Sequence, residues 1–214
     1  MQTLTAKIIE AGWSNRVTTE SQLARLLGGT PQRRHSLVNR ALHHDEVLRL
    51  SRGRYLLKPS SSHSSIHPFV LAQALRPGSY ISFESALSFH GWIPEATKVT
   101  LSVVPGRRSY EMTHVLLGHF RFSPLALQRG YFLERVDRQL FGGQVALVAQ
   151  PLRALLDLLC LRKENDVGRE MLEQGLRIEP ELLDNITEED LQSLPVIYQN
   201  KRIQKLIHHI LIRE

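Results

Sequence analysis

Along residues 31–44, polar side chains recur at spacings that place them on one face of a helix, and apolar side chains fall on the opposite face. The polar face consists of Gln32, Ser36, Asn39, Arg40 and His43, with Arg33 at its edge. The apolar face consists of Leu37, Val38, Ala41 and Leu42. Amide, hydroxyl, imidazole and guanidinium groups hydrogen-bond base edges and phosphates. We therefore predict that this helix presents a surface that reads nucleic acid.

The preceding residues predict the elements that position this helix. A first helix is expected over residues 3–12, where apolar residues recur at helical spacing. Thr19-Glu20-Ser21-Gln22 matches a capping box and predicts a second helix that ends at Gly28-Gly29. Thr30-Pro31 then begins the third helix, because threonine caps well and proline is favoured at the first helical position.

Two short apolar runs follow, Val47–Leu50 and Tyr55–Leu57, around a turn that contains Gly53. This pattern predicts a β-hairpin. Three helices followed by a basic hairpin form the order of a winged helix-turn-helix. Winged helices also serve as protein–protein modules, so the order alone leaves both uses open.

Within a winged helix-turn-helix, the third helix presents its polar face to the major groove. The hairpin would place Arg52 and Arg54 along the backbone or in the minor groove. We add Thr19, at the start of the second helix, to the candidate DNA-binding residues.

Positive charge is concentrated in the same part of the chain. The 214 residues carry a formal net charge of +6, and residues 1–58 hold ten Lys and Arg against four Asp and Glu. Residues 59–214 hold 17 basic and 17 acidic residues and are neutral overall. This distribution favours a polyanionic partner such as double-stranded DNA, although a solvated basic surface without a partner has the same composition.

A serine-rich stretch separates the two parts. Residues 58–65 contain five serines and one proline and nothing apolar, a composition typical of a linker. We predict a winged helix-turn-helix domain at 1–58, a linker at 59–66 and a second domain at 67–214.

The second domain is predicted to be α+β, with an antiparallel sheet and C-terminal helices. Helices are expected over 66–75, from Ser82 to His90-Gly91, from Pro151, and over 199–213. Strands are expected over 98–104, 115–117, 120–122, 131–136 and 144–149, with Gly142-Gly143 as a hairpin turn. The last helix places Ile203, Leu206, Ile207, Ile210 and Leu211 on one face, which packs within its own domain or meets a partner.

Residue patterns of enzymes and metal sites are missing from the sequence. No glycine-rich loop is followed by the lysine of a phosphate-binding motif, and no Asp-x-Asp follows Gly78-Ser79 at a useful distance. His43-His44 and His208-His209 are adjacent, whereas two ligands on a helix need a spacing of four. Cys160 lies among leucines, as a small buried hydrophobe does. We expect no catalytic residue, no metal and no cofactor.

Composition points to a globular chain in a reducing compartment. Hydrophobic residues make up 42% of the sequence and charged residues 22%, which is ordinary for a globular protein. A single cysteine cannot form an internal disulfide, so we expect a cytoplasmic location. No stretch approaches the ~18 apolar residues of a membrane span, and residues 1–4 lack the pattern of a secretory signal.

Three segments resemble one family. Tyr80-Ile-Ser-Phe-Glu-Ser-Ala-Leu-Ser-Phe-His-Gly91 is similar to the characteristic stretch of AbiEi-type antitoxins, which follows an N-terminal winged helix in that family. Val148-Ala-Gln-Pro-Leu-Arg-Ala-Leu-Leu-Asp157 resembles their second shared segment, and Arg52-Gly53-Arg54-Tyr55 their wing. The resemblance covers nearly the whole chain.

Membership of this family would imply a repressor that binds the operator of its own operon. It would also imply an antitoxin that counteracts a nucleotidyltransferase-type toxin in a type IV phage-defence (abortive infection) system. Antitoxins of this kind are thought to act without a stable toxin complex.

Other interpretations stay open at this point. Most of residues 80–91 also fit a purely structural role, with Ser82 and Ser85 starting a helix, Ala86, Leu87 and Phe89 buried, and Gly91 as a left-handed cap. A winged-helix regulator whose second domain senses a ligand or dimerises, without any toxin, is the main alternative function. A nucleic-acid-processing enzyme is a third.

Overall fold

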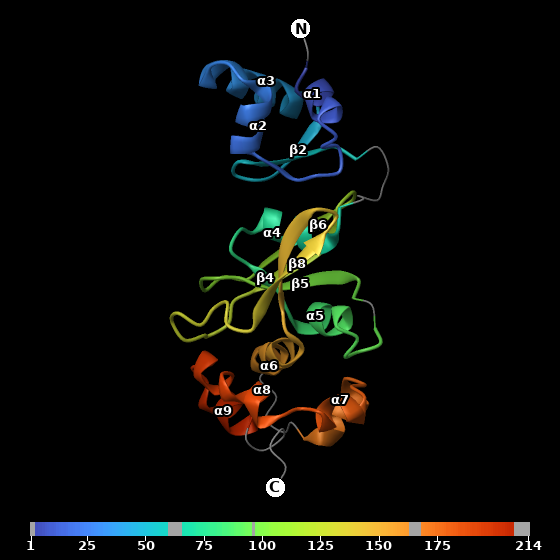
Figure 1. Ribbon diagram of the computed structural model, residues 1–214, viewed down its shortest axis with the longest axis vertical. Coiled ribbons are helices and arrows are strands. Elements are labelled where there is room, and N and C mark those ends of the chain that lie inside the picture. The colour runs from blue at the N-terminus through green and yellow to red at the C-terminus, as the bar shows by residue number, and fades with distance from the viewer. Residues whose placement is uncertain (1–2, 60–65, 96, 163–167, 208–214) are drawn as a thin grey trace. The chain divides into compact units, whose positions relative to one another are not determined.

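The computed structural model describes residues 3–59, 66–95, 97–162 and 168–207. Residues 60–65 of the predicted linker, the pair His208-His209 and the end of the last predicted helix lie outside the described residues. The chain divides into two compact units, and Figure 1 labels their helices and strands. The first comprises Met1–Pro77, Thr113–Gly118 and Leu140–Val145, and the second comprises Gly78–Met112, His119–Gln139 and Ala146–Glu214.

Within the first unit, three helices precede a small antiparallel sheet. The sheet has the strand order β1-β3-β2, and β3 pairs with both neighbours. In chain order the elements are α1 (Leu4–Glu10), β1 (Thr18–Thr19), α2 (Glu20–Leu27), α3 (Pro31–His43), β2 (Val47–Ser51), β3 (Arg54–Leu57) and α4 (Pro68–Leu75). The three helices and the hairpin lie where the sequence predicts them.

Local capping explains where α2 and α3 begin. The Thr19 hydroxyl accepts a hydrogen bond from the Gln22 amide, and the Gln22 side chain accepts one from the Thr19 amide at 2.8 Å. The predicted capping box is therefore confirmed. Thr30 caps α3 through the Arg33 amide, with Pro31 at the first position as expected. One apolar cluster, which includes Leu4, Leu23, Leu37 and Tyr55, packs the helices against the sheet.

The first unit extends further along the chain than the predicted boundary at residue 58. Helix α4 packs against β2, and the Ser51 hydroxyl donates to the Ala74 carbonyl at 2.6 Å. The unit accordingly continues to Pro77. Serine-rich composition indicates an exposed stretch but does not show on which side of it the next helix packs.

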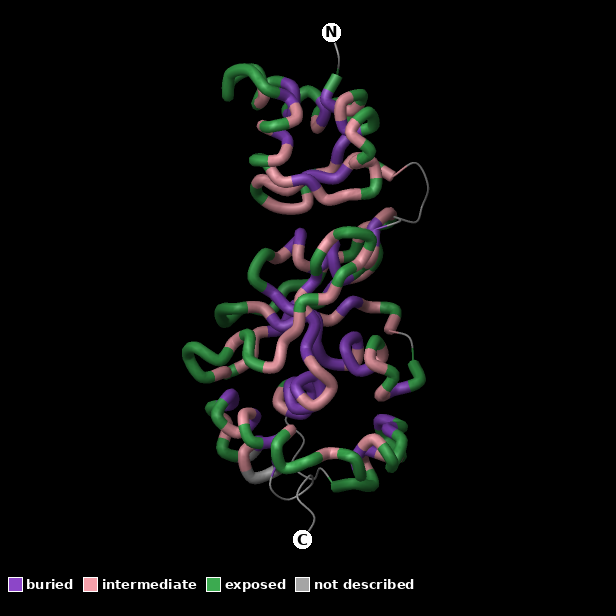
Figure 2. The backbone as a smooth tube through the Cα atoms, in the orientation of Figure 1, coloured by how far each residue is buried: buried purple, intermediate pink, exposed green. Residues whose placement is uncertain are grey.

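A six-stranded sheet and the helix α6 dominate residues 80–162. The strands are β4 (Tyr80–Ile81), β5 (Val99–Val103), β6 (Tyr110–His114), β7 (Gly118–Ser123), β8 (Val136–Phe141) and β9 (Gln144–Ala149), in the order β6-β7-β5-β4-β9-β8. Helix α5 (Phe83–Phe89) packs against β5 and against α6 (Pro151–Arg162). The seven consecutive residues Arg153–Leu159 of α6 are buried (Figure 2).

The α+β class and the C-terminal helices agree with the prediction, but the sheet is mixed. Strand β4, which the sequence did not predict, is antiparallel to β5. Two other pairs, β4 with β9 and β5 with β7, are parallel. The sequence pattern did not predict the parallel pairs, because alternation within a strand shows which face is buried and does not show which strand pairs with it or in which direction. Strand β4, with two residues, is also too short to show alternation.

Two predicted strands are wrong. Residues 115–117 form the turn between β6 and β7, where Val115 is 89% exposed. Most of residues 131–136 also form a turn, and Arg135 there has a positive φ of 56°. Both are short apolar runs, a pattern that does not by itself distinguish a strand from a turn. The Gly142-Gly143 turn is confirmed, since both φ angles are positive as a tight hairpin turn requires.

The C-terminal part is built from short helices. They are one turn of π-helix (Met171–Gly175), α7 (Pro180–Asp184), α8 (Glu188–Gln192), a 3₁₀ turn (Pro195–Ile197) and α9 (Lys201–Leu206). Ile203 and Ile207 are buried, so this face packs within the protein over the part of the chain that is described. None of the described helices has the length and apolar character needed to cross a membrane.

Candidate nucleic-acid interface

The two faces of α3 differ as the sequence predicts. Leu37, Val38 and Ala41 are buried, and Leu42 is partly buried. The polar residues Gln32, Arg33, Ser36, Asn39, Arg40 and His43 are all exposed. Packing on one side thus fixes the helix and leaves the other side available to a ligand. Arg34 is only partly exposed and hydrogen-bonds the Gly29 carbonyl, so it does not belong to the polar face.

Some side chains on this face are already engaged with their own helix. Ser36 donates its hydroxyl hydrogen to the Gln32 carbonyl at 3.0 Å, and the Asn39 amide lies 3.1 Å from the His35 ring nitrogen Nδ1. By contrast, the side chains of Gln32, Arg33, Arg40 and His43 have no hydrogen-bond partner among the described residues. Their donors are open to water or to a nucleic acid.

The predicted wing residues occupy two different environments. Arg52 lies exposed in the β2–β3 turn, next to Gly53 with a φ of 70°. The Gly53 carbonyl accepts a hydrogen bond from the Glu20 amide at 2.8 Å, which fixes the turn to the start of α2. Arg54 is the first residue of β3 and is partly buried, opposite Thr19 of β1. Arg52 is therefore the better placed of the two to reach a phosphate.

Thr19 has a structural task that limits its use as a DNA contact. Its hydroxyl accepts from the Gln22 amide in the capping box and also lies 3.0 Å from the Ser21 hydroxyl. The polar face of α3, Arg52 and the start of α2 thus belong to the same unit. Among the predicted DNA contacts, Arg54 and Thr19 are the least accessible to DNA.

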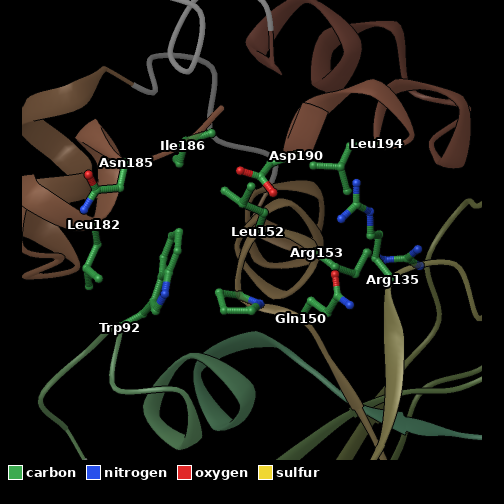
Figure 3. Close-up of a pocket in the computed structure, with 11 residues that line it drawn as sticks. Trp92, Arg135, Gln150, Leu152, Arg153, Leu182, Asn185, Ile186, Asp190 and Leu194 are labelled. Carbon is green, nitrogen blue, oxygen red and sulfur yellow. The ribbon is translucent and has the colours of Figure 1, made fainter. Parts of the chain in front are cut away.

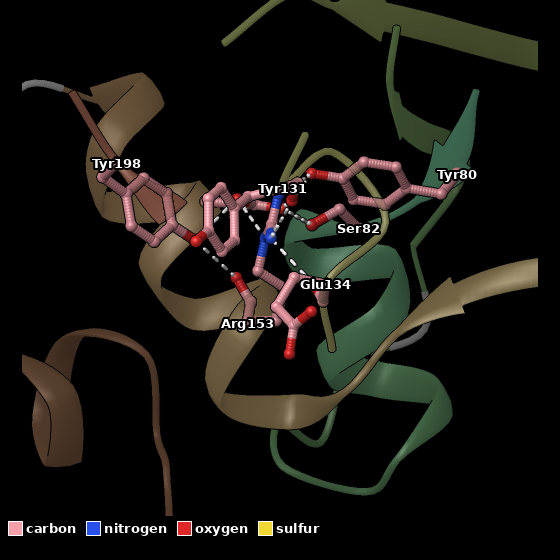
Figure 4. A network of polar contacts seen from close by, with 7 residues as sticks. Tyr80, Ser82, Tyr131, Glu134, Arg153 and Tyr198 are labelled. Carbon is pink, nitrogen blue, oxygen red and sulfur yellow. Dashed lines mark hydrogen bonds and ion pairs between the residues drawn. The ribbon is translucent and has the colours of Figure 1, made fainter. Parts of the chain in front are cut away.

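The second unit contains a buried network of charged and polar side chains (Figure 4). Asp157 of α6 is at its centre, and each of its carboxylate oxygens accepts two hydrogen bonds. Oδ2 accepts from the Tyr80 and Ser82 hydroxyls at 2.9 and 2.7 Å. Oδ1 accepts from Arg153 Nε at 3.0 Å and from the Tyr198 hydroxyl at 2.8 Å. Asp157 and Arg153 are both 0% exposed.

Arg153 carries the network from Asp157 to the backbone. One terminal nitrogen of its guanidinium donates to the Tyr80 hydroxyl at 2.7 Å, and the other donates to the Glu134 carbonyl at 2.9 Å. The turn around residue 134 therefore directs its carbonyl groups at a buried cation. This contact gives a physical reason for the turn that replaces the predicted strand over 131–136.

Burial and charge shift the ionisation of these groups. Burial raises the pKa of Tyr80 and of Tyr198 well above the usual value, and the negative charge of Asp157 raises both further. Burial alone would lower the pKa of Arg153, but Asp157 and the two tyrosines raise it overall. The phenols are neutral and the guanidinium charged at neutral pH. A buried ion pair whose hydrogen bonds are satisfied in this way positions the elements around it.

The network joins two segments of the sequence that are far apart. Tyr80 and Ser82 belong to the stretch 80–91, and Arg153 and Asp157 to the stretch 148–157. One feature of the sequence could have indicated this network, the spacing of four between Arg153 and Asp157, which allows an ion pair on a helix. No feature of the sequence indicated that Tyr198 belongs to the network.

Residues 80–91 match most, but not all, of their expected structural roles. Gly91 has a φ of 72° and ends α5 as a left-handed residue, and Ala86 and Leu87 are buried, as predicted. Ser82 stands at the N-cap but makes no capping hydrogen bond, because its hydroxyl binds Asp157. Phe89 is 40% exposed and does not join the core.

Among the described residues, no group of three or more His, Cys, Asp and Glu side chains is placed to hold a metal ion.

The chain matches no protein-family model, and comparison with curated proteins also gives no match. The similarity to AbiEi-type antitoxins therefore rests on the three segments quoted above.

Proposed function

We propose that the protein is a DNA-binding transcriptional regulator of the cytoplasm whose first unit is a winged helix-turn-helix. The observation that carries this proposal is the division of α3 into a buried apolar face and an exposed polar face with unpaired donors. The net positive charge of residues 1–58 supports it, because phosphate contacts supply much of the affinity for DNA. No catalytic step is part of the proposal.

The geometry suggests different roles in DNA binding for helix α3 and for the β2–β3 hairpin. Asn39 and Arg40 are exposed on α3 and would contact base edges in the major groove, where amide and guanidinium groups discriminate between base pairs. Asn39 would exchange its contact with His35 for one with a base. Arg52 at the tip of the hairpin would contact the phosphate backbone, which adds affinity without sequence information.

We further propose that the regulator represses its own operon and acts as an antitoxin against a nucleotidyltransferase-type toxin. This part rests on the resemblance to AbiEi-type proteins. It is supported by the contact between the segments 80–91 and 148–157, since both contribute side chains to one buried network. A buried network of this kind would fix the two segments that resemble the family against each other. It does not itself form the surface that would act against a toxin.

DNA binding is tested by titrating the full chain against the DNA upstream of its own gene and against unrelated DNA, with fluorescence anisotropy as the readout. We expect tighter binding to the upstream DNA. The double substitution Asn39→Ala/Arg40→Ala should remove that preference, and Arg129→Ala, an exposed arginine of the second unit, should leave it unchanged. Equal affinity of the wild-type chain for both DNAs would contradict sequence-specific repression.

Antitoxin activity is tested by expressing the neighbouring gene with and without this one and measuring growth. Growth arrest that this chain relieves supports the proposal. A neighbour without a nucleotidyltransferase motif, or arrest that this chain does not relieve, favours the alternative of a winged-helix regulator with a sensing domain.

A further inference from the structure

A pocket of about 270 Å³ lies within the second unit, beside the start of α6 (Figure 3). Trp92, Pro151, Leu152 and Ile186 form most of its apolar lining, and Arg135 and Asp190 contribute opposite charges. These residues come from the segment after α5, the segment before β8, the first turn of α6, and the region of α7 and α8. Pockets with an apolar lining and a few converging polar groups are the usual form of small-molecule sites.

The size and lining of the pocket limit what it can hold. An apolar cavity of ~150 Å³ accommodates a benzene molecule. The larger volume here has room for one branched or aromatic side chain together with a small polar head. Figure 3 shows the Trp92 ring on one side of the pocket and Arg135 with Gln150 on the other. An apolar body would therefore lie against Trp92, with its polar head toward the charged residues.

Arg135 is held in place but keeps unused donors. Its Nε donates to the Ser193 hydroxyl at 2.8 Å, and one terminal nitrogen donates to the Glu189 carbonyl at 3.2 Å. The backbone carbonyl of Arg135 accepts a hydrogen bond from the backbone N–H of Gln150 at 2.9 Å. A guanidinium has five N–H donors, so most of them have no acceptor among the described residues.

Asp190 is ionised and has one unused oxygen. Its Oδ2 accepts from the Thr187 amide at 3.0 Å and from the Thr187 hydroxyl at 2.7 Å. These hydrogen bonds lower the pKa of Asp190, and the charge of Arg135 lowers it further. Among the described residues no hydrogen bond reaches Oδ1, and no ion pair joins Asp190 to Arg135. The two opposite charges line one pocket without neutralising each other by direct contact.

We propose that this pocket binds a zwitterionic small molecule with an apolar body, such as a free α-amino acid with a branched or aromatic side chain. The carboxylate of the ligand would bind Arg135, its ammonium group would bind Asp190, and its side chain would lie against Trp92. A simple carboxylate would leave Asp190 facing a like charge, and a simple amine would do the same to Arg135. The pocket lies wholly in the second unit, so this proposal does not depend on DNA binding.

Isothermal titration calorimetry of the full chain tests the proposal with L-leucine, L-phenylalanine and two leucine analogues. The analogue 4-methylpentanoate lacks the ammonium group, and 3-methylbutylamine lacks the carboxylate. At least one amino acid should bind, and its analogues should bind about tenfold more weakly or worse, the loss expected for one charge-assisted hydrogen bond. If only phenylalanine binds, the analogues are 3-phenylpropanoate and 2-phenylethylamine. No heat from either amino acid up to ~10 mM, or equal binding of the analogues, would overturn the proposal.

Variants and fluorescence locate the binding site. The chain has two tryptophans, so Trp13→Phe leaves Trp92 as the single reporter, and its emission should change on titration with the amino acid. Asp190→Asn should weaken binding about tenfold, whereas Glu188→Gln, an exposed carboxylate in the same helix, should not. Binding that leaves Trp92 emission and the Asp190→Asn affinity unchanged places the ligand elsewhere and overturns the assignment. If Asp190→Asn does not fold, the analogue series on the wild-type chain decides.

Discussion

Arg153 and Asp157 lie one turn apart on α6, with Nε and Oδ1 separated by 3.0 Å and both side chains fully buried. Three hydroxyl groups from β4, from the residue that follows β4, and from the segment before α9 complete the shell around the carboxylate. One ion pair therefore connects the sheet, the longest described helix of this unit and the C-terminal segment.

Replacing Asp157 by Asn should destabilise the protein severely. The substitution keeps the size of the side chain but leaves the Arg153 charge buried and unpaired, a change that costs about 3–5 kcal/mol of unfolding free energy. Urea denaturation followed by circular dichroism measures the difference. The matched control is Glu173→Gln, which breaks the i, i+4 pair with Arg169 on the surface and should cost much less, because solvent screens an exposed ion pair. Similar losses in the two variants would show that the buried pair contributes no more than a surface pair.

Stability should fall at alkaline pH because of the two buried phenols. Their pKa values are raised in the folded protein, whereas a tyrosine in the unfolded chain ionises near pH ~10. Their contribution is complete below that pH and declines above it, by at most about 1.4 kcal/mol per pH unit for each tyrosine. Urea denaturation between about pH 8 and pH 11 should show a shallower decline for Tyr198→Phe than for wild type. The exposed Tyr131 provides the control, and a Tyr131→Phe slope that matched Tyr198→Phe would refute the assignment.

The sequence predicted the helices and the hairpin of residues 3–57 well because their signals are local. The Thr19–Gln22 box and the Thr30-Pro31 start are read from neighbouring residues, and the spacing of Leu37, Val38 and Ala41 shows which side of α3 is buried. Two failures further along the chain concern contacts between distant segments. Nothing near residue 134 shows that its carbonyl binds Arg153, and nothing near Ser82 shows that Asp157 takes its hydroxyl from the helix cap.

In the candidate site, too, local features could be predicted from the sequence and contacts between distant segments could not. The α3 face was predicted from periodicity alone, but the difference between Arg52 and Arg54 depends on strand register, since Arg54 pairs opposite Thr19. The pocket could not be predicted, because its charged residues Arg135 and Asp190 come from segments 55 positions apart with no shared motif.

Substitutions on the two faces of α3 should affect different properties, the stability of the fold on the apolar face and DNA affinity on the polar face. Leu37→Ala removes a buried side chain and should lower the unfolding free energy by about 2–5 kcal/mol. Arg40→Ala changes an exposed residue and should leave stability within about 0.5 kcal/mol of wild type, while it weakens operator binding by about 1–3 kcal/mol if Arg40 contacts a base. Thermal unfolding and a gel-shift titration measure the two effects. Unchanged operator affinity in Arg40→Ala would remove this residue from the reading face.

Arg52→Ala should weaken binding to operator and unrelated DNA about equally. A phosphate contact carries no sequence information, and its loss flattens the dependence of log affinity on log salt by about 0.9. Arg54→Ala should have a smaller effect, because Arg54 is partly buried in β3. Anisotropy titrations at several salt concentrations measure both slopes. A loss confined to the operator would mean that the wing reads sequence.

Repression and toxin neutralisation should be separable by substitutions in the first unit that leave the fold intact. A deletion up to residue 60 is a poor test, because it would remove β2 and leave α4 without its partner. The double substitution Arg40→Ala/Arg52→Ala changes exposed side chains only, so both units should stay folded. We expect this variant to lose repression of a reporter placed behind its own promoter and still to rescue growth when the neighbouring gene, the proposed toxin, is expressed. Asp157→Asn is the complementary variant, since loss of the buried network should abolish rescue through unfolding of the second unit. If Arg40→Ala/Arg52→Ala gave no protection at equal expression and with an unchanged circular dichroism spectrum, the DNA-binding face would have to take part in neutralising the toxin.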